Sequence, residues 1–219
     1  IITSAHTKNI GSSIIEDATT IISLNVFATD YTKTATTSGV SGTDYKSATS
    51  NISDIEALKN AYQSALLAYE KNIVPISHEL NRAVIHNDGN DHNVIVNKDN
   101  RVHGIIDFGD MVHTYIICES AVCLAYLVLK NPDPIDLTAD LIKAYQTVFP
   151  LTELEISVII YFICLRLCVS VTMAAYRKQL FPDNKYIIVT ENQAWGFLRK
   201  MKNVDLQGWS DKVVDKTFH

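Results

Sequence analysis

Apolar side chains recur along most of this chain at the spacing of amphipathic helices. The first such pattern begins near Ser53 and runs to about Asn72, with an apolar residue at every third or fourth position. Ser53 is a favourable N-cap residue, and Glu56 follows three positions later, which is the spacing of a capping box. We therefore expect a helix to begin directly after Ser53.

Three short runs rich in Val and Ile follow this helix and predict strands. They cover residues 82–85, 94–96 and 102–106. Residues 97–100, with the sequence NKDN, are typical of a turn and separate the last two runs. We expect these two runs to form a hairpin.

After Asp110 the pattern becomes helical again, and prolines mark its breaks. The expected helices cover roughly residues 115–130, 136–148, 152–180 and 190–202. Residues 156–176 are apolar and long enough to be compared with a membrane span. Arg166 lies in their middle and would cost roughly 2.5–3.5 kcal/mol at a bilayer centre. We therefore interpret this segment as the central helix of a soluble helical domain.

Residues 1–52 differ from the rest of the chain. Nineteen of the first fifty residues are Ser or Thr, and few large aliphatic residues lie between Thr29 and Asn51. Because such a composition contributes little to a core, we expect a loosely structured segment. The chain then divides into residues 1–52, a folded domain over residues 53–203 and a C-terminal tail over residues 204–219.

Composition and charge narrow the range of partners. The chain has 219 residues, of which 47% are hydrophobic, and this is enough for a sizeable core. A formal net charge of −5 provides no basic surface for nucleic acid or an anionic membrane, so we expect neither as a partner. All four cysteines lie in apolar runs and no secretory signal opens the chain, which favours reduced thiols and a cytoplasmic location.

Residues 84–110 contain the candidate chemistry. Close together around two short expected strands lie four carboxylates: Asp88, Asp91, Asp107 and Asp110. Carboxylates on one surface repel one another unless a cation lies between them. A divalent cation together with a transferring phosphate would account for all four.

The order of the residues in this segment is typical of kinases. His86, Asp88 and Asn93 form the pattern H-x-D-x-x-x-x-N, and a DFG triplet begins at Asp107 after a strand and a turn. In kinases the loop Asp accepts the hydroxyl proton, while the Asn and the DFG Asp bind Mg²⁺. We therefore expect Asp88 to act as the base, and Asn93 and Asp107 to bind Mg²⁺. His86 and Asp91 are expected to support the loop.

Two segments of the chain resemble the aminoglycoside phosphotransferase family of small-molecule kinases. They are IHNDGNDHNVIV and GIIDFGDMVHTYIICESAVCLAYLVL, and within the family they resemble the hydroxylysine kinase branch, which includes kinase-like domains fused to aminotransferases. The run PDNKYIIVTENQAWGFL resembles the C-terminal part of that branch, so the resemblance covers about residues 53–203.

This resemblance implies an α+β, protein-kinase-like fold, represented mainly by the helical C-lobe with a short β-hairpin that carries the catalytic loop. It also implies transfer of the γ-phosphate of ATP, or of GTP, to a hydroxyl group. By motif match, Asp88 would be the catalytic base, and Asn93 and Asp107 the Mg²⁺ ligands.

The chain departs from the family pattern in its loop and at its N-terminal side. The family usually has Gly where this chain has Asn87, and a larger residue where it has Gly89. The N-lobe that binds the nucleotide is largely absent, because neither a Gly-rich phosphate loop nor a strand lysine precedes residue 53. Residues 1–52 would be a remnant of that lobe or a linker, and the nucleotide-binding residues stay unassigned.

Three residues are candidates for binding the acceptor. Asp110 and Glu119 lie near the expected metal ligands and could bind an amine, but Glu119 could equally be paired internally on its apolar helix. Arg166 could bind a substrate carboxylate through two contacts, or it could pair with Glu119 or a helix C-terminus. The expected acceptor is an amino-alcohol, an amino-acid-like molecule or an aminoglycoside-like molecule.

Two other functions stay open. A truncated protein or pseudokinase that binds without turnover would account for the missing N-lobe. A metal-dependent hydrolase would use His86, Asp88, Asp91 and His92 as ligands, but it leaves Asn93 and the DFG triplet unexplained. For the kinase, the expected partners are a nucleotide and a small hydroxylated substrate, and fusion to or association with other enzyme domains would fit the branch.

Overall fold

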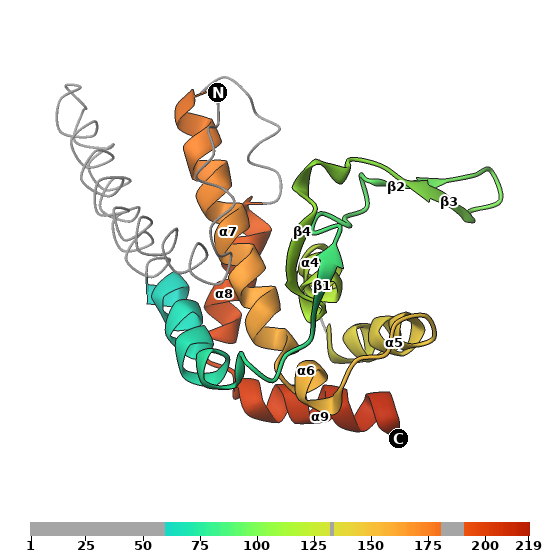
Figure 1. Cartoon of the computed structure of the whole chain (residues 1–219). Coiled ribbons are helices and arrows are strands. Elements are labelled where there is room, and N and C mark those ends of the chain that lie inside the picture. The colour runs from blue at the N-terminus through green and yellow to red at the C-terminus, as the bar shows by residue number, and fades with distance from the viewer. Residues whose placement is uncertain (1–59, 132–133, 181–190) are drawn as a thin grey trace, which may run out of the picture. The chain divides into compact units, whose positions relative to one another are not determined.

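The computed structural model describes residues 60–131, 134–180 and 191–219 (Figure 1). By its internal contacts the chain divides into two compact units, Ile1–Gln63 and Ser64–His219. The second unit contains all the strands and labelled helices of Figure 1, and with them the candidate site.

Most of the described chain is helical, as the apolar spacing predicts. Residues 60–72 form the first described helix, whereas Ser53, Glu56 and the segment 1–52 lie outside the described residues. A short 3₁₀ turn, η1 (Val74–Ile76), follows this helix. The further α-helices among the described residues are α4 (Ile117–Leu127), α5 (Pro134–Gln146), α6 (Glu153–Ser157), α7 (Ile159–Leu180), α8 (Glu191–Met201) and α9 (Leu206–Phe218).

Helix α7 is the central element of the helical core. It contacts α4, α6, α8 and α9, and its residues 159–165, 167 and 168 are each at most 5% exposed. Neighbouring helices thus bury most sides of α7 over residues 159–168, which explains why this part of the chain is apolar apart from Arg166. Across the described ranges of the chain, no helix combines the length and apolar character needed to cross a membrane.

The short strands pair as two antiparallel ribbons. Strand β2 (Val94–Val96) pairs with β3 (Val102–Ile105), as the turn between them predicts. In that turn, the Asn97 side chain accepts hydrogen bonds from the backbone N–H groups of Asp99 and Arg101, each at 3.0 Å. The first predicted strand is also present, as β1 (Arg82–Ile85), so the structure contains all three strands that the sequence predicts.

Two elements differ from the sequence expectations. Strand β4 (Val112–Tyr115) pairs with β1, although the pattern predicts a loop leading into a helix there. Its Val, Thr and Tyr are good strand formers, but four residues are too few for a clear alternation. Residues 204–219, expected as a tail, contain α9, which contacts α5, α6 and α7 and buries Trp209 and Val213.

The single helix expected over residues 152–180 is divided at Val158 into α6 and α7. Glu155 on α6 is fully buried, and its carboxylate accepts hydrogen bonds from the backbone N–H and hydroxyl of Thr152 at 2.8 and 3.0 Å. It also accepts one from the backbone N–H of Asn81 at 3.0 Å. Glu155 therefore joins the residue before β1 to the start of α6, because a buried carboxylate is tolerated only when it is hydrogen-bonded.

The four cysteines are free thiols, as their apolar surroundings predict. Cys164 and Cys168 lie on α7 and are buried. Burial raises the pKa of the Cys164 thiol to about 12 and that of Cys168 well above its usual range. These two residues are therefore neutral at physiological pH and act as small hydrophobic core residues.

We expect Glu155→Ala to lower the free energy of unfolding by about 3 kcal/mol, because the backbone N–H groups of Thr152 and Asn81 lose a charged acceptor and α6 loses its capping box. Urea denaturation followed by circular dichroism measures this change. Glu153→Ala is the matched control, since Glu153 is exposed on the same helix and its replacement should cost about 0.5 kcal/mol or less. Equal effects of the two variants would contradict a structural role for Glu155.

Candidate active site

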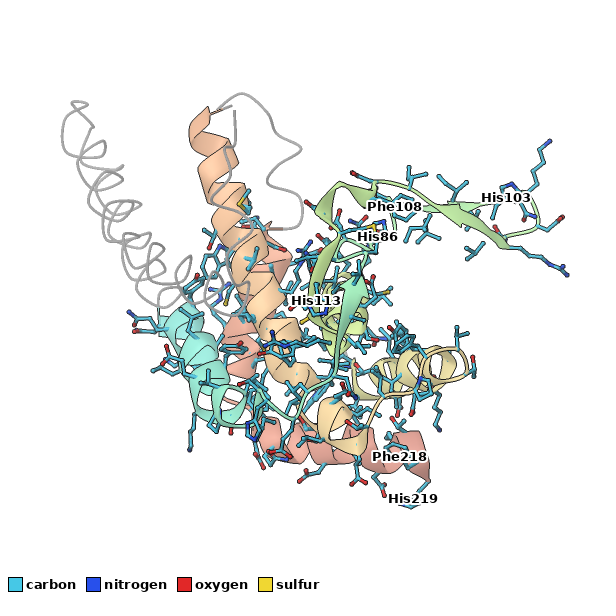
Figure 2. All side chains as sticks on the ribbon, in the orientation of Figure 1. His86, His103, Phe108, His113, Phe218 and His219 are labelled. Carbon is cyan, nitrogen blue, oxygen red and sulfur yellow. The ribbon has the colours of Figure 1, made fainter. Side chains whose placement is uncertain are left out.

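The candidate site consists of the loop between β1 and β2, residues 86–93, and the segment that follows β3. Two hydrogen bonds join them: the Ile106 N–H donates to the Asn93 carbonyl at 2.9 Å, and His86 Nε2 donates to the Ile106 carbonyl at 3.0 Å. The His86 and Phe108 rings also meet edge to face, with centroids 5.0 Å apart (Figure 2). The structure therefore brings the H-x-D-x-x-x-x-N loop and the DFG triplet together.

The hydrogen bonds of His86 indicate a supporting role. Its Nδ1 accepts a hydrogen bond from the backbone N–H of Asp88 at 3.3 Å, while its Nε2 donates to Ile106. Both bonds fit one neutral tautomer, with the proton on Nε2. Both ring nitrogens of His86 thus form hydrogen bonds with the backbone of the site.

The Asp88 carboxylate is held from two sides. Its Oδ2 accepts a hydrogen bond from Asn93 Nδ2 at 2.8 Å, and its Oδ1 forms an ion pair with Arg166 Nη2 at 2.8 Å. Asn93 Nδ2 also donates to the Asp88 backbone carbonyl at 2.8 Å. Asn93 is 8% exposed and the Asp88 side chain 19%, so the carboxylate lies at the edge of the protein interior and can be reached by a small molecule.

Asn90 is a buried loop residue that the sequence patterns do not single out. Its backbone N–H donates to the Asp88 carbonyl at 2.8 Å, and its side-chain Oδ1 accepts a hydrogen bond from the His92 N–H at 2.9 Å. Both bonds are local, over two residues each, and Asn favours such turns. The only signal in the sequence is this turn preference, which is shared by many surface Asn residues.

Glu119 on α4 binds the backbone of the loop. Its Oε2 accepts hydrogen bonds from the N–H groups of His86 at 2.6 Å and Asn87 at 3.1 Å. Of the two interpretations of Glu119, internal pairing is therefore the one that the geometry favours. A Cβ atom at Gly89 would lie 2.9 Å from Glu119 Oε1, which explains why this position has no side chain.

Asn87 and Asp107 both have left-handed backbone conformations, with φ of 65° and 66°. Asn and Asp tolerate this region better than other residues with side chains. This explains how Asn87 occupies a position where the family usually has Gly. The left-handed backbone of Asn87 carries a small cost in conformational strain.

The remaining predicted site residues lie at the surface. Asp107 precedes the 3₁₀ turn η2 (Phe108–Asp110), and both Asp107 and Asp110 are exposed. The Asp91 side chain is 52% exposed, and it forms an ion pair with Lys130 at the surface, at 3.4 Å, rather than a contact with Asp88. Such exposed pairs contribute little to stability.

The donor atoms at the site fit Mg²⁺ better than zinc. Asn93 Nδ2 donates to Asp88, so the amide oxygen of Asn93 is directed away from Asp88. Asp107 has an exposed carboxylate and directly follows Ile106, whose N–H donates to the Asn93 carbonyl. Mg²⁺ in phosphoryl-transfer sites commonly takes one or two protein oxygens together with substrate phosphates. Within the described part of the chain, no three His, Cys, Asp or Glu side chains are close enough to bind a metal ion, as a dinuclear hydrolase site requires.

An apolar surface lies beside this site. Val96 and Val102 on the hairpin are 55% and 72% exposed, and Ile106 and Phe108 next to Asp107 are 48% and 55% exposed. Figure 1 shows the β2–β3 hairpin extending away from α4 and α5. Ile106 and Phe108 flank Asp107 in the chain, so this end of the apolar surface lies next to the DFG triplet.

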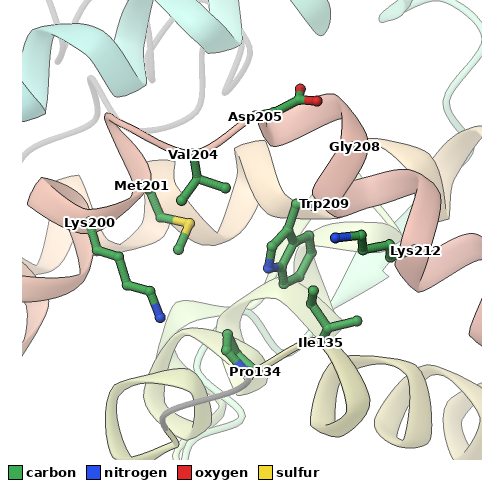
Figure 3. Close-up of a pocket in the computed structure, with 9 residues that line it drawn as sticks. All are labelled: Pro134, Ile135, Lys200, Met201, Val204, Asp205, Gly208, Trp209 and Lys212. Carbon is green, nitrogen blue, oxygen red and sulfur yellow. The ribbon is translucent and has the colours of Figure 1, made fainter.

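A pocket of about 530 Å³ lies elsewhere, between the start of α5, the end of α8 and the start of α9 (Figure 3). Pro134, Met201 and Trp209 line it, together with the side chains of Lys200 and Lys212. These helices carry none of the predicted site residues, so the pocket is separate from Asp88.

Comparison with known proteins identifies the family to which the chain belongs. A family model described as "Phosphotransferase enzyme family" (APH) matches residues 44–154, just over half of the chain, and the chain belongs to this family. The family resemblance expected from the two motif segments is thereby confirmed. No solved structure matches the chain.

The relatives that match the chain are hydroxylysine kinases. The protein of Mus musculus is 32% identical over 141 residues, which cover 60% of this chain and 37% of the relative. That of Xenopus laevis is 29% identical over 157 residues, which cover 67% of this chain and 42% of the relative. The chain therefore spans about two fifths of the length of these two relatives.

We expect Glu119→Ala to lower the free energy of unfolding by about 2 kcal/mol, because the amides of His86 and Asn87 lose a charged acceptor. Glu119→Gln is the conservative control, since it keeps one acceptor oxygen and should lose about half as much. Urea denaturation measures both changes, and NMR hydrogen exchange of the two amides tests the local effect. Unchanged exchange in the Ala variant would contradict the contact.

Proposed function

We propose that this chain carries the phosphoryl-transfer site of a small-molecule kinase, which transfers the γ-phosphate of ATP or GTP to a hydroxyl group of the acceptor. The observation that carries the proposal is the Asp88 carboxylate, held by Asn93 and Arg166 on a loop that is bonded to the DFG segment. Membership of the phosphotransferase family supports this chemistry. The helical domain with its small ribbons is consistent with the C-lobe of a protein-kinase-like fold.

In this mechanism Asp88 orients the acceptor hydroxyl and accepts its proton. Each oxygen of its carboxylate has one side-chain partner among the residues that the structure describes, and a carboxylate oxygen has two lone pairs. One lone pair on each oxygen is therefore free for the acceptor. A base positioned in this way contributes both orientation and proton transfer.

Asn93 and Asp107 would bind Mg²⁺, which when bound neutralises charge on the β- and γ-phosphates of the nucleotide. The hydrogen bonds from Asn93 Nδ2 to Asp88 orient the amide so that its oxygen is left for the metal. Asp107 is exposed, and its left-handed backbone sets the direction in which its carboxylate leaves the chain. The base and the metal ligands are thus linked through Asn93.

The acceptor is proposed to be a hydroxylated amine or amino acid. This is supported by the relatives, which are named hydroxylysine kinases, and by the exposed carboxylate of Asp110 near Asp107, which suits an amine. Glu119 is used by the loop amides and Arg166 by Asp88, so neither supports acceptor binding in this arrangement. Hydroxylysine is therefore the first acceptor to test.

We expect Asp88→Asn to reduce turnover of Mg–ATP and hydroxylysine by about 10²- to 10⁴-fold, because the variant keeps the shape of the base but accepts no proton. A coupled assay of ADP formation measures turnover. Asp99→Asn in the exposed hairpin turn is the matched control and should keep the wild-type rate. Full activity of Asp88→Asn would rule out the base, and an inactive wild type that still binds Mg–ATP would favour a pseudokinase.

We expect Asp107→Asn to weaken Mg–ATP binding by about 10-fold or more, because a metal ligand is removed while the left-handed backbone is still tolerated. Titration calorimetry measures the dissociation constant. In the same experiment Asp88→Asn should bind Mg–ATP within about 2-fold of the wild type, since losing a base alone costs little ground-state affinity. An unchanged dissociation constant for Asp107→Asn would contradict its assignment as a ligand.

A further inference from the structure

Arg166 is a charged residue in α7, between apolar side chains that are buried in the helical core. Its neighbours along α7, Leu165 and Leu167, are 5% and 2% exposed, and its own side chain is 21% exposed. A guanidinium group removed from water in this way loses hydration, and only well-placed acceptors compensate for that loss. The contacts that Arg166 makes therefore indicate why a charge is present there.

The guanidinium is directed to the proposed base. Arg166 Nη2 lies 2.8 Å from Asp88 Oδ1 and 3.4 Å from the hydroxyl of Tyr126 on α4. Its Nε is buried and has no hydrogen-bond partner among the described residues. An arginine placed for stability alone would use this donor as well, because an unpaired buried N–H is costly. The shorter of the two Nη2 contacts, which is also the one ion pair that Arg166 forms among the described residues, is the one to Asp88.

The contact completes a two-sided fixation of the Asp88 carboxylate. Asn93 Nδ2 binds Oδ2 from within the loop, and Arg166 binds Oδ1 from α7, 78 positions further along the chain. Either donor alone would leave the carboxylate free to rotate about its terminal torsion, which is broad in Asp. Together they define the plane of the carboxylate and hence the direction of its unused lone pairs.

Helix α7, which carries Arg166, is held in place by its packing. It packs against α4 and α8, and most of its side chains from Ile159 to Cys168 are buried. Packing of that density limits movement of the helix. The orientation of Asp88 is therefore set by the protein core before a nucleotide or acceptor arrives.

We propose that Arg166 is a positioning residue, which holds the Asp88 carboxylate in the orientation that receives the acceptor hydroxyl. The inference rests on the proposed function, since it concerns the base of that reaction. It differs from a contact between Arg166 and a carboxylate of the acceptor, which would change acceptor affinity rather than turnover.

The test compares Arg166→Met and Arg166→Lys with the wild-type chain, using Mg–ATP and hydroxylysine. We expect the Met variant to lower kcat by about 100-fold, the loss typical of a misplaced catalytic group, with KM for hydroxylysine within about 2-fold of the wild type. The Lys variant should keep part of the rate, and added guanidinium ion should restore part of it to the Met variant. Thr172→Val on the same helix is the control, since the Thr172 hydroxyl donates to the Cys168 carbonyl within α7.

A raised KM with unchanged kcat would overturn the proposal in favour of acceptor binding, and unchanged kcat and KM would overturn it outright. A double-mutant cycle supplies a readout that does not need activity: unfolding midpoints are measured for Arg166→Met, Asp88→Asn and the double variant. We expect the double variant to shift the midpoint by less than the sum of the single shifts, and additive shifts would overturn the pairing. An inactive wild type would contradict the proposed function, whereas the cycle would still decide whether Arg166 holds Asp88.

Discussion

The packing of α4 against α7 is the contact on which the geometry of the candidate site depends. Helix α4 carries Glu119, which binds the backbone of the loop, and α7 carries Arg166, which binds its key carboxylate. The loop itself contains only short turns and has no regular structure that could maintain its shape. Two helices with opposite charges directed at it therefore determine where Asp88 lies.

Backbone strain and the partial burial of charged groups destabilise this arrangement, and specific contacts compensate for both. Asn87 and Asp107 have strained left-handed backbones, and Glu119 and Arg166 are partly withdrawn from water. The charged groups are compensated by backbone amides and by Asp88, and the strained residues are of the types that tolerate positive φ best. Sites that must keep a reactive group in one orientation commonly carry local strain of this kind.

The sequence is informative about this site because its signals are local. Spacing within a few residues is enough to predict β1, β2 and β3 and to place Asp88 and Asn93 in one loop, whereas the hydrogen bond between their side chains is seen only in the structure. The family assignment also follows from two continuous segments. Asp107 is recognisable for the same reason, as part of a short motif.

Other features depend on residues far apart in the chain, which local patterns do not connect. The ion pair of Arg166 with Asp88 joins residues 78 positions apart, and the sequence suggests other partners for Arg166: Glu119, a helix C-terminus or a substrate carboxylate. Strand β4 becomes recognisable only when it pairs with β1, and α9 only when its buried Trp209 meets other helices. Their identity therefore follows from tertiary packing rather than from propensity.

The exposed β2–β3 hairpin has a consequence for the behaviour of the chain in solution. Both of its strands are edge strands with free backbone donors and acceptors, and Val96 and Val102 present apolar side chains to solvent. An edge of this kind readily adds a strand from another molecule. Unless another surface shields the hairpin, concentrated samples will tend to self-associate through it, and a lysine substituted for Val102 would make the chain easier to keep monomeric.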